Sequence, residues 1–176
     1  MGVCSETKPT LLAGYIITIV AFVIHLIGFS TPYWNILTFP KFKMHFGLWK
    51  SCTIKTIRTI SISTCVSTGD DPSLDGELTG TQAVECIAFI LFVAAVICLT
   101  IRMFALKDKD ILILVAVGLC IAAGVFALIG VVIFGVSEKY KDNLHFSFAF
   151  CVIGGVAGIS AGAVLVVTRC RSLLYQ

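Results

Sequence analysis

The chain has 176 residues, of which 58% are hydrophobic and only 13% are charged, and its mean hydropathy of +1.01 lies well outside the range of water-soluble domains. The net charge of +3 is small and forms no block of like charge, which argues against a nucleic-acid partner. The composition therefore indicates an integral membrane protein, for which lipid is the first partner.

Four apolar segments are long enough to cross a bilayer, which requires about 20 residues of helix. They run over residues 11–29, 83–101, 111–134 and 146–167. Each is expected to be a continuous helix, because in hydrocarbon every backbone amide must find its partner internally. A cleaved signal peptide is the alternative for the first segment, but that segment is longer than a usual signal and lacks a small-residue cleavage site. We expect a membrane α-helical protein with four transmembrane helices and a single domain over residues 1–176.

The polar segments between these spans are unequal in length. Residues 30–82 form a long loop and residues 135–145 a short one on the same side of the membrane. The other side holds residues 1–10, 102–110 and 168–176, in which basic residues are packed more densely near helix ends. Cytoplasmic segments are enriched in Lys and Arg, so both termini are predicted to be cytoplasmic and both loops extracellular, in a multi-pass protein of the plasma membrane.

Six of the eight cysteines lie in or beside the spans. Cys4 and Cys170 flank the membrane on the cytoplasmic side and are candidates for palmitoylation. Four cysteines within the spans are expected to act as small apolar side chains. These are Cys86, Cys98, Cys120 and Cys151.

Cys52 and Cys65 are the remaining pair and share the long polar loop. An extracellular compartment favours a disulfide between them. A metal site is the alternative, but His45 is the nearest further ligand and the spacing matches no common zinc pattern. No metal and no other cofactor is predicted.

The long loop has the composition of a small β-sheet. β-Branched residues dominate residues 53–66, where no helix cap or helical period is present. Residues 32–37 and 44–49 are expected to form earlier strands, with a turn at Phe39-Pro40 between them. Gly69-Asp70-Asp71-Pro72 predicts a turn that ends the sheet. We therefore expect a small antiparallel sheet that covers one end of the helices.

Trp34, the triplet Gly47-Leu48-Trp49, and the pair Cys52 and Cys65 all lie in the first loop of this four-span chain. The arrangement resembles the W-GLW-C-C signature of the claudin, epithelial membrane protein and peripheral myelin protein superfamily. The resemblance implies a left-handed four-helix bundle with an extracellular sheet, in which Cys52 and Cys65 bridge adjacent strands. It also implies that Trp34 and the triplet anchor the sheet to the outer helix ends. This is physically reasonable, because an indole ring prefers the headgroup layer, where its N–H contacts water.

The chain departs from the claudin pattern in several places. The interval from Trp34 to Gly47 is shorter than in typical claudins and the interval between the cysteines is longer. Gln82 replaces the basic residue that claudins usually carry before the second span. The chain ends in Tyr175-Gln176 rather than in a hydrophobic residue, so no direct PDZ ligand is expected.

His25 and Glu85 are the strongly polar ionisable side chains within the spans, where a charge costs about 2.5–3.5 kcal/mol at mid-bilayer. Both lie near the outer ends at comparable depth, so they either pair with each other or reach the interface separately. Gly154, Gly158 and Gly162 are spaced four apart in the last span and form a small-residue face. That face is expected to pack within the bundle or against a neighbouring molecule.

No catalytic motif is present, and no enzymatic activity is expected. By the resemblance, Asp70 and Asp71 are candidate charges of the paracellular path; the alternative is a solvated turn. The favoured function is a structural protein of cell–cell junctions, tight or septate. It forms or regulates the paracellular barrier by self-association, in cis and in trans, with copies of itself or related proteins. The alternative is a tetraspan regulator, either an auxiliary subunit of a channel or an adhesion and trafficking factor.

Overall fold

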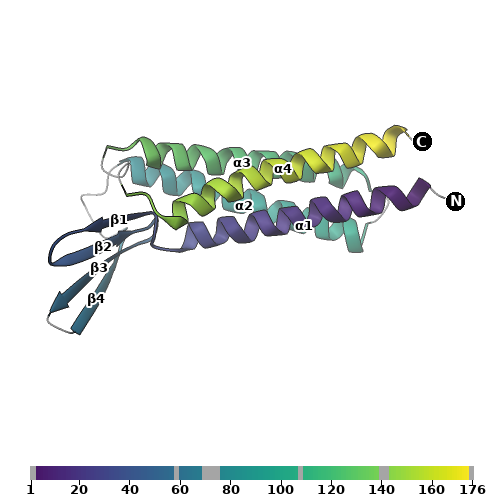
Figure 1. Ribbon diagram of the computed structural model, residues 1–176. Helices are drawn as coiled ribbons and strands as arrows, with labels where there is room; N and C mark the ends of the chain where they lie inside the picture. The colour runs from purple at the N-terminus through teal and green to yellow at the C-terminus, as the bar shows by residue number, and fades with distance from the viewer. Residues whose placement is uncertain (1–2, 58–59, 69–75, 107–108, 139–142, 175–176) are drawn as a thin grey trace.

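The computed structural model contains four long helices and one four-stranded antiparallel sheet at one end of them (Figure 1). The helices are α1 (Val3–Ser30), α2 (Gly76–Phe104), α3 (Ile111–Val136) and α4 (Phe146–Leu174). The strands are β1 (Asn35–Thr38), β2 (Phe42–Phe46), β3 (Lys50–Ile57) and β4 (Ile60–Ser67). The structure describes residues 3–57, 60–68, 76–106, 109–138 and 143–174.

Each helix contains a segment long and apolar enough to cross a membrane, which confirms the four predicted apolar helices. The helices are longer than the predicted windows, because only their hydrocarbon-embedded part must be apolar while the hydrogen-bonded backbone continues beyond it. α2 in particular begins at Gly76, so the end of the polar segment predicted over residues 30–82 is helix rather than loop.

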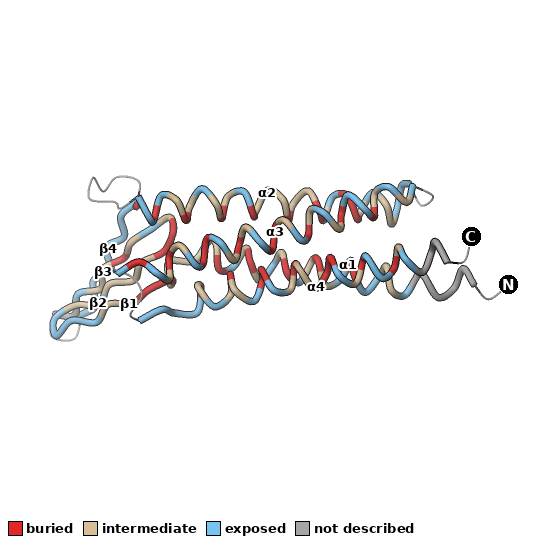
Figure 2. The backbone as a smooth tube through the Cα atoms, turned by 90° about the horizontal axis from the view of Figure 1, so that it is seen from above, coloured by how far each residue is buried: buried red, intermediate tan, exposed pale blue. Residues whose placement is uncertain are grey.

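The helices form a bundle in which α1 packs mainly against α4, α4 against α3 and α3 against α2. α1 begins and α4 ends at the end of the bundle away from the sheet (Figure 1). Buried positions lie along the inner side of each helix and exposed ones along the outer side (Figure 2). The exposed positions include large apolar side chains such as Ile90, Ile97 and Val132, whereas buried ones include Ala88, Ala95 and several other alanines. This is the pattern of a bundle solvated by lipid, in which small residues allow helices to approach closely.

The strands follow the order β1-β2-β3-β4, with every neighbouring pair antiparallel. The predicted sheet is confirmed, and the chain reverses at Phe39-Pro40 as predicted, between β1 and β2.

The bounds of the two earlier strands differ from the prediction. The strand expected over residues 32–37 is β1, Asn35–Thr38, and the strand expected over residues 44–49 is β2, Phe42–Phe46. The triplet Gly47-Leu48-Trp49 lies beyond β2, because its tryptophan bonds to the end of α1 and its glycine packs against the backbone just after α1. The strand-like composition expected over residues 53–66 is confirmed, since residues 53–57 belong to β3 and residues 60–66 to β4. β-Branched residues favour both arms equally, so composition did not locate the reversal. The predicted turn at residues 69–72 lies outside the described residues.

Candidate functional site: the sheet and its anchor

The β3–β4 hairpin is joined by a disulfide between Cys52 and Cys65, as predicted. The two residues stand directly opposite each other in the antiparallel register. Closing a loop of this size contributes roughly 3 kcal/mol in the chain-entropy model. The contribution matters here because all eight residues of β4 are exposed, so apolar burial does little to hold that strand in place.

Trp34 anchors the start of the sheet to the end of α1. Its side chain is completely buried, and its Nε1–H donates a hydrogen bond of 2.9 Å to the carbonyl oxygen of Gly28. Its ring meets Phe134 of α3 and Phe148 of α4 edge-on, with centroids 4.9 and 6.0 Å away. The last carbonyls of a helix have no partner within the helix, and the indole satisfies one of them.

The triplet Gly47-Leu48-Trp49 forms the second anchor. Trp49 Nε1–H donates a hydrogen bond of 2.9 Å to the carbonyl oxygen of Phe29, and the two rings lie 5.1 Å apart. Leu48 is completely buried in the core beneath the sheet. Gly47 lies so close to the backbone of Pro32 that a Cβ would overlap it, so glycine is required for the approach.

The expectation that the indole N–H groups contact water is wrong for both tryptophans. Two consecutive carbonyls at the end of α1, those of Gly28 and Phe29, accept the bonds that water would otherwise make. A protein acceptor at that point satisfies the N–H while the ring gains apolar contacts. The anchor consists of directional bonds to one helix end.

Gln82 ties the same anchor to α2. Its Nε2 donates to the carbonyl oxygen of Leu48 at 2.5 Å, and the Thr68 hydroxyl donates to that oxygen at 2.8 Å. The sequence marked Gln82 only as a departure from the claudin pattern and did not predict this bond. The signal was nevertheless present, because an amide, like a basic group, supplies N–H donors next to the anchor.

Residues 143–145, the described end of the connection from α3 to α4, lie against the β1 side of the sheet. Asn35 of β1 forms an antiparallel bridge with Leu144, and the His145 N–H donates to the Trp34 carbonyl at 2.9 Å. Asn143 adopts a φ of 67°, a left-handed conformation that asparagine tolerates. The sheet is thus fixed to the bundle from α1, α2 and the start of α4.

His45 of β2 lies where the sheet meets this connection. Its ring packs edge-on against Tyr33, with centroids 4.9 Å apart, and Tyr33 also packs against Phe146 at 5.0 Å. Partial burial, followed by the positive charges of His145 and Lys43, lowers the pKa of His45 below its ordinary value of 6.5. The neutral imidazole is therefore the form that this contact favours.

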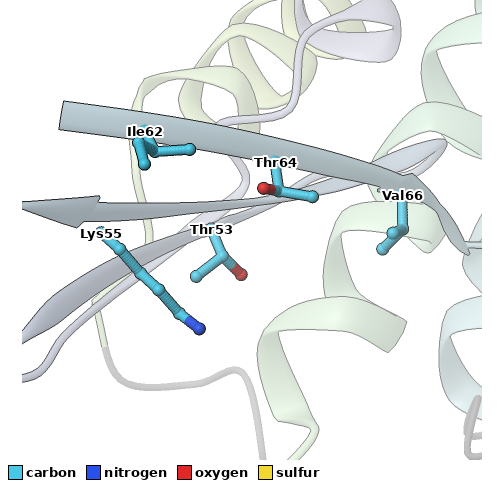
Figure 3. Close-up of a pocket in the computed structure, with 5 residues that line it drawn as sticks. All are labelled: Thr53, Lys55, Ile62, Thr64 and Val66. Atoms are coloured by element: carbon cyan, nitrogen blue, oxygen red, sulfur yellow. The ribbon is translucent and has the colours of Figure 1, made fainter.

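β4 is the outer strand on the opposite side of the sheet, and within the described part of the chain no further strand pairs with it. Ile60, Ile62 and Val66 share one face of β4 and are 66%, 52% and 56% exposed. Figure 3 shows this face, where a shallow hollow crosses the hairpin. Its lining consists of Thr53, Lys55, Ile62, Thr64 and Val66. A group of exposed apolar side chains on a rigid strand is typical of an interaction surface.

A family model described as the PMP-22/EMP/MP20/Claudin family matches residues 8–165, which include the first three spans, the whole sheet and most of the fourth span. The chain belongs to this family. Membership confirms the resemblance drawn from Trp34, the triplet and the cysteine pair, and with it the claudin-like fold of a multi-pass membrane protein. A search of curated proteins gave no match.

Inside the bundle of this claudin-family protein, His25 of α1 and Glu85 of α2 lie next to each other, both completely buried. The distance from His25 Nδ1 to Glu85 Oε2 is 3.7 Å, which is too long for a hydrogen bond. Cys151 of α4 completes a cluster whose candidate ligand atoms all lie within 4.8 Å of one another. The sequence identified the first two residues but not Cys151, because a cysteine in an apolar span carries no signal of which helix it faces.

The glycines of α4 lie against other helices of the same chain. A Cβ at Gly154 would meet α1, one at Gly158 would meet a phenyl ring of α2, and one at Gly162 would meet an isoleucine of α3. The glycines therefore hold α4 close to all three other helices instead of forming one outward face.

The structure does not test several further predicted residues. Asp70 and Asp71 lie outside the described residues. Cys170 is exposed near the end of α4, while the side chain of Cys4 is outside the described part of the chain. The paracellular charges and the lipidation remain predictions.

Proposed function

We propose that this protein is a structural component of cell–cell junctions, where it forms or regulates the paracellular barrier by associating with copies of itself. The observation that carries the proposal is the exposed apolar face of β4 on a sheet that is fixed to the bundle. Outer strands bind further strands through main-chain hydrogen bonds, and their side chains supply the specificity. The family to which the chain belongs is consistent with such a role.

The rigid anchor is what makes β4 suitable for assembly. The bonds of Trp34, Trp49 and Gln82 fix the sheet to two helices, so contacts between neighbouring sheets set the orientation of whole molecules in the membrane. With both termini cytoplasmic, as the density of basic residues indicates, the sheet lies outside the cell at the plasma membrane. Neighbours in one membrane associate through β4, and molecules on facing cells meet through the loops.

Asp70 and Asp71 follow β4 in the chain and belong to the same proposal. As carboxylates beside the path between cells, they attract cations over a Debye length of about 8 Å at physiological salt. These two carboxylates influence which ions pass between the cells, whereas β4 determines whether the molecules assemble at all.

Expression in cells that lack junctions tests the proposal. Freeze-fracture microscopy is expected to show intercellular strands, and the transepithelial resistance of a cell layer is expected to change. Ile62→Lys on β4 should remove the strands while the protein still reaches the surface. Thr38→Lys is the matched control, because it adds the same charge at an exposed position of β1.

The alternative role as a tetraspan regulator predicts a different result in the same cells. A wild-type protein at the surface that forms no strands, leaves the resistance unchanged and co-purifies with one channel would overturn the junctional role. It would support the alternative of a tetraspan regulator.

A further inference from the structure

The cluster formed by His25, Glu85 and Cys151, here called the inner cluster, has no part in the junctional role. Its members come from α1, α2 and α4, and each is 0% exposed. All their candidate ligand atoms lie within 4.8 Å of one another. The inner cluster therefore gathers three side chains of metal-binding type from three helices.

The polar atoms of the inner cluster lack partners within the described residues. Both ring nitrogens of His25 and both carboxyl oxygens of Glu85 are buried without a hydrogen bond. A buried polar group without a partner destabilises the folded protein, and more so when it is charged. The 3.7 Å between the two side chains leaves these atoms unsatisfied, so the arrangement points to a ligand that bonds to both.

We propose that the inner cluster binds a Zn²⁺ ion through a ring nitrogen of His25, the carboxylate of Glu85 and the thiolate of Cys151. Imidazole, carboxylate and thiolate are the side-chain groups that bind zinc in proteins, at about 2.0–2.3 Å. Tetrahedral geometry with zinc–nitrogen and zinc–oxygen bonds of about 2.0–2.2 Å separates the nitrogen from the oxygen by about 3.3–3.5 Å. The separation of 3.7 Å between His25 Nδ1 and Glu85 Oε2 is close to this value.

The charges of the three ligands also fit a divalent ion. One carboxylate and one thiolate balance the two positive charges of Zn²⁺, and the neutral imidazole adds none, so the occupied site is neutral in the low dielectric of the bundle. Binding releases the thiol proton of Cys151 and any proton on Glu85 to water. Mg²⁺ and Ca²⁺ are disfavoured by the sulfur ligand, and Cu(I) by the carboxylate.

Three glycines on neighbouring helices hold the inner cluster in place. A Cβ at Gly154 would meet the histidine at 2.9 Å, one at Gly130 would meet the carboxylate at 2.6 Å, and one at Gly28 would meet the sulfur at 2.7 Å. Each ligand side chain therefore has a neighbouring helix backbone directly against it. Packing of this kind restricts the side chains to a few orientations, which favours a pre-formed site.

Metal content of the purified full-length protein in detergent micelles tests the proposal. After equilibration with buffered zinc and removal of free metal by gel filtration, elemental mass spectrometry should find one zinc ion per chain in the wild type. Cys151→Ala should lose it. Cys120→Ala is the matched control, because Cys120 is equally buried in the same bundle but lies outside the inner cluster, and it should keep the ion.

Two further measurements keep the test decisive if a variant folds poorly. Replacement of zinc by Co²⁺ in the wild type should produce a thiolate-to-cobalt charge-transfer band, which His25→Ala and Glu85→Gln should weaken. Zinc should raise the Tm of the wild type but not of Cys151→Ala, because an ion that binds only the folded state stabilises it. A folded wild type that takes up no zinc would overturn the proposal, as would equal uptake by Cys151→Ala or loss of the ion in Cys120→Ala.

Discussion

The helix bundle and the sheet of this protein are held together by different means. In the bundle, small residues let long apolar helices approach one another, and most of the outer surface is apolar because lipid solvates it. The sheet is held by a disulfide, a few hydrogen bonds to helix ends and a small apolar core around Trp34 and Leu48, and β4 stays exposed. The stability of the sheet therefore depends on a small number of individual residues, whereas the stability of the bundle is distributed over many. Substitutions at the anchor should therefore separate the two regions.

Trp34 should show the largest effect because it belongs to both regions. Trp34→Ala removes a completely buried ring and the bond to Gly28, and large-to-small changes of this kind cost about 3–5 kcal/mol. We expect the variant to fail to reach the cell surface. Trp34→Phe keeps an aromatic ring at this position but loses the N–H donor and part of the buried ring volume, so it should cost less than the alanine variant and reach the surface. Equal surface delivery of both variants and the wild type would contradict the role of the anchor.

Loss of the disulfide should act on the sheet alone. In the double variant of Cys52→Ser and Cys65→Ser the sheet should lose roughly 3 kcal/mol, since its unfolded form is no longer constrained. Limited proteolysis should then cut within β3 and β4, while circular dichroism shows unchanged helix content. A fall in helix content of the purified variant would mean that the two regions are not separable.

Gln82 gives a smaller effect that also tests how the chain departs from the claudin pattern. Gln82→Ala removes the donor to the Leu48 carbonyl and should cost about 1 kcal/mol, seen as a lower Tm in micelles. Gln82→Lys restores an N–H donor and should return most of the loss. If alanine and lysine at this position behave alike, the hydrogen bond does not matter.

His45 should make the sheet weakly dependent on pH. Its pKa is lowered in the folded sheet, so as the pH falls below 6.5 the unfolded chain takes up the proton first. The stabilisation of the folded sheet by neutral His45 is complete above pH 6.5 and declines as the pH falls through the lowered pKa of His45 in the folded state. Tm measured against pH should show this decline in the wild type and a flatter profile in His45→Gln. If Tm depends on pH in His45→Gln as it does in the wild type, His45 is not the group responsible for the pH dependence.

The sequence predicted the features that are set by composition or by a local motif. The four spans follow from the length of apolar helix that a bilayer requires, and the disulfide follows from the one cysteine pair in a polar loop. Features set by contacts between distant segments were missed. The indole of Trp34 finds a carbonyl of α1, and Gln82 finds one beside the triplet, only after the chain has folded.

The same limit applies inside the membrane. His25 and Glu85 were noticed because ionisable groups are rare in a span, whereas Cys151 was classed with the other apolar thiols. Glycines such as Gly154 determine which faces of α1, α2 and α4 pack together. A repeat of small residues in the sequence does not indicate which helix packs against it. Composition and local motifs therefore locate the elements and the anchor residues of this chain, whereas the partners of those residues follow only from the folded geometry.

Cross-linking in intact cells tests directly whether neighbouring molecules associate through β4. Ile62→Cys places a single thiol on the exposed face of that strand, and Thr38→Cys places one on β1 as the control. If neighbouring molecules associate through β4, mild oxidation should link Ile62→Cys into covalent dimers in cells that display junctional strands, with little linkage of Thr38→Cys. Equal linkage of the two variants, or strands without any linkage through position 62, would contradict the account.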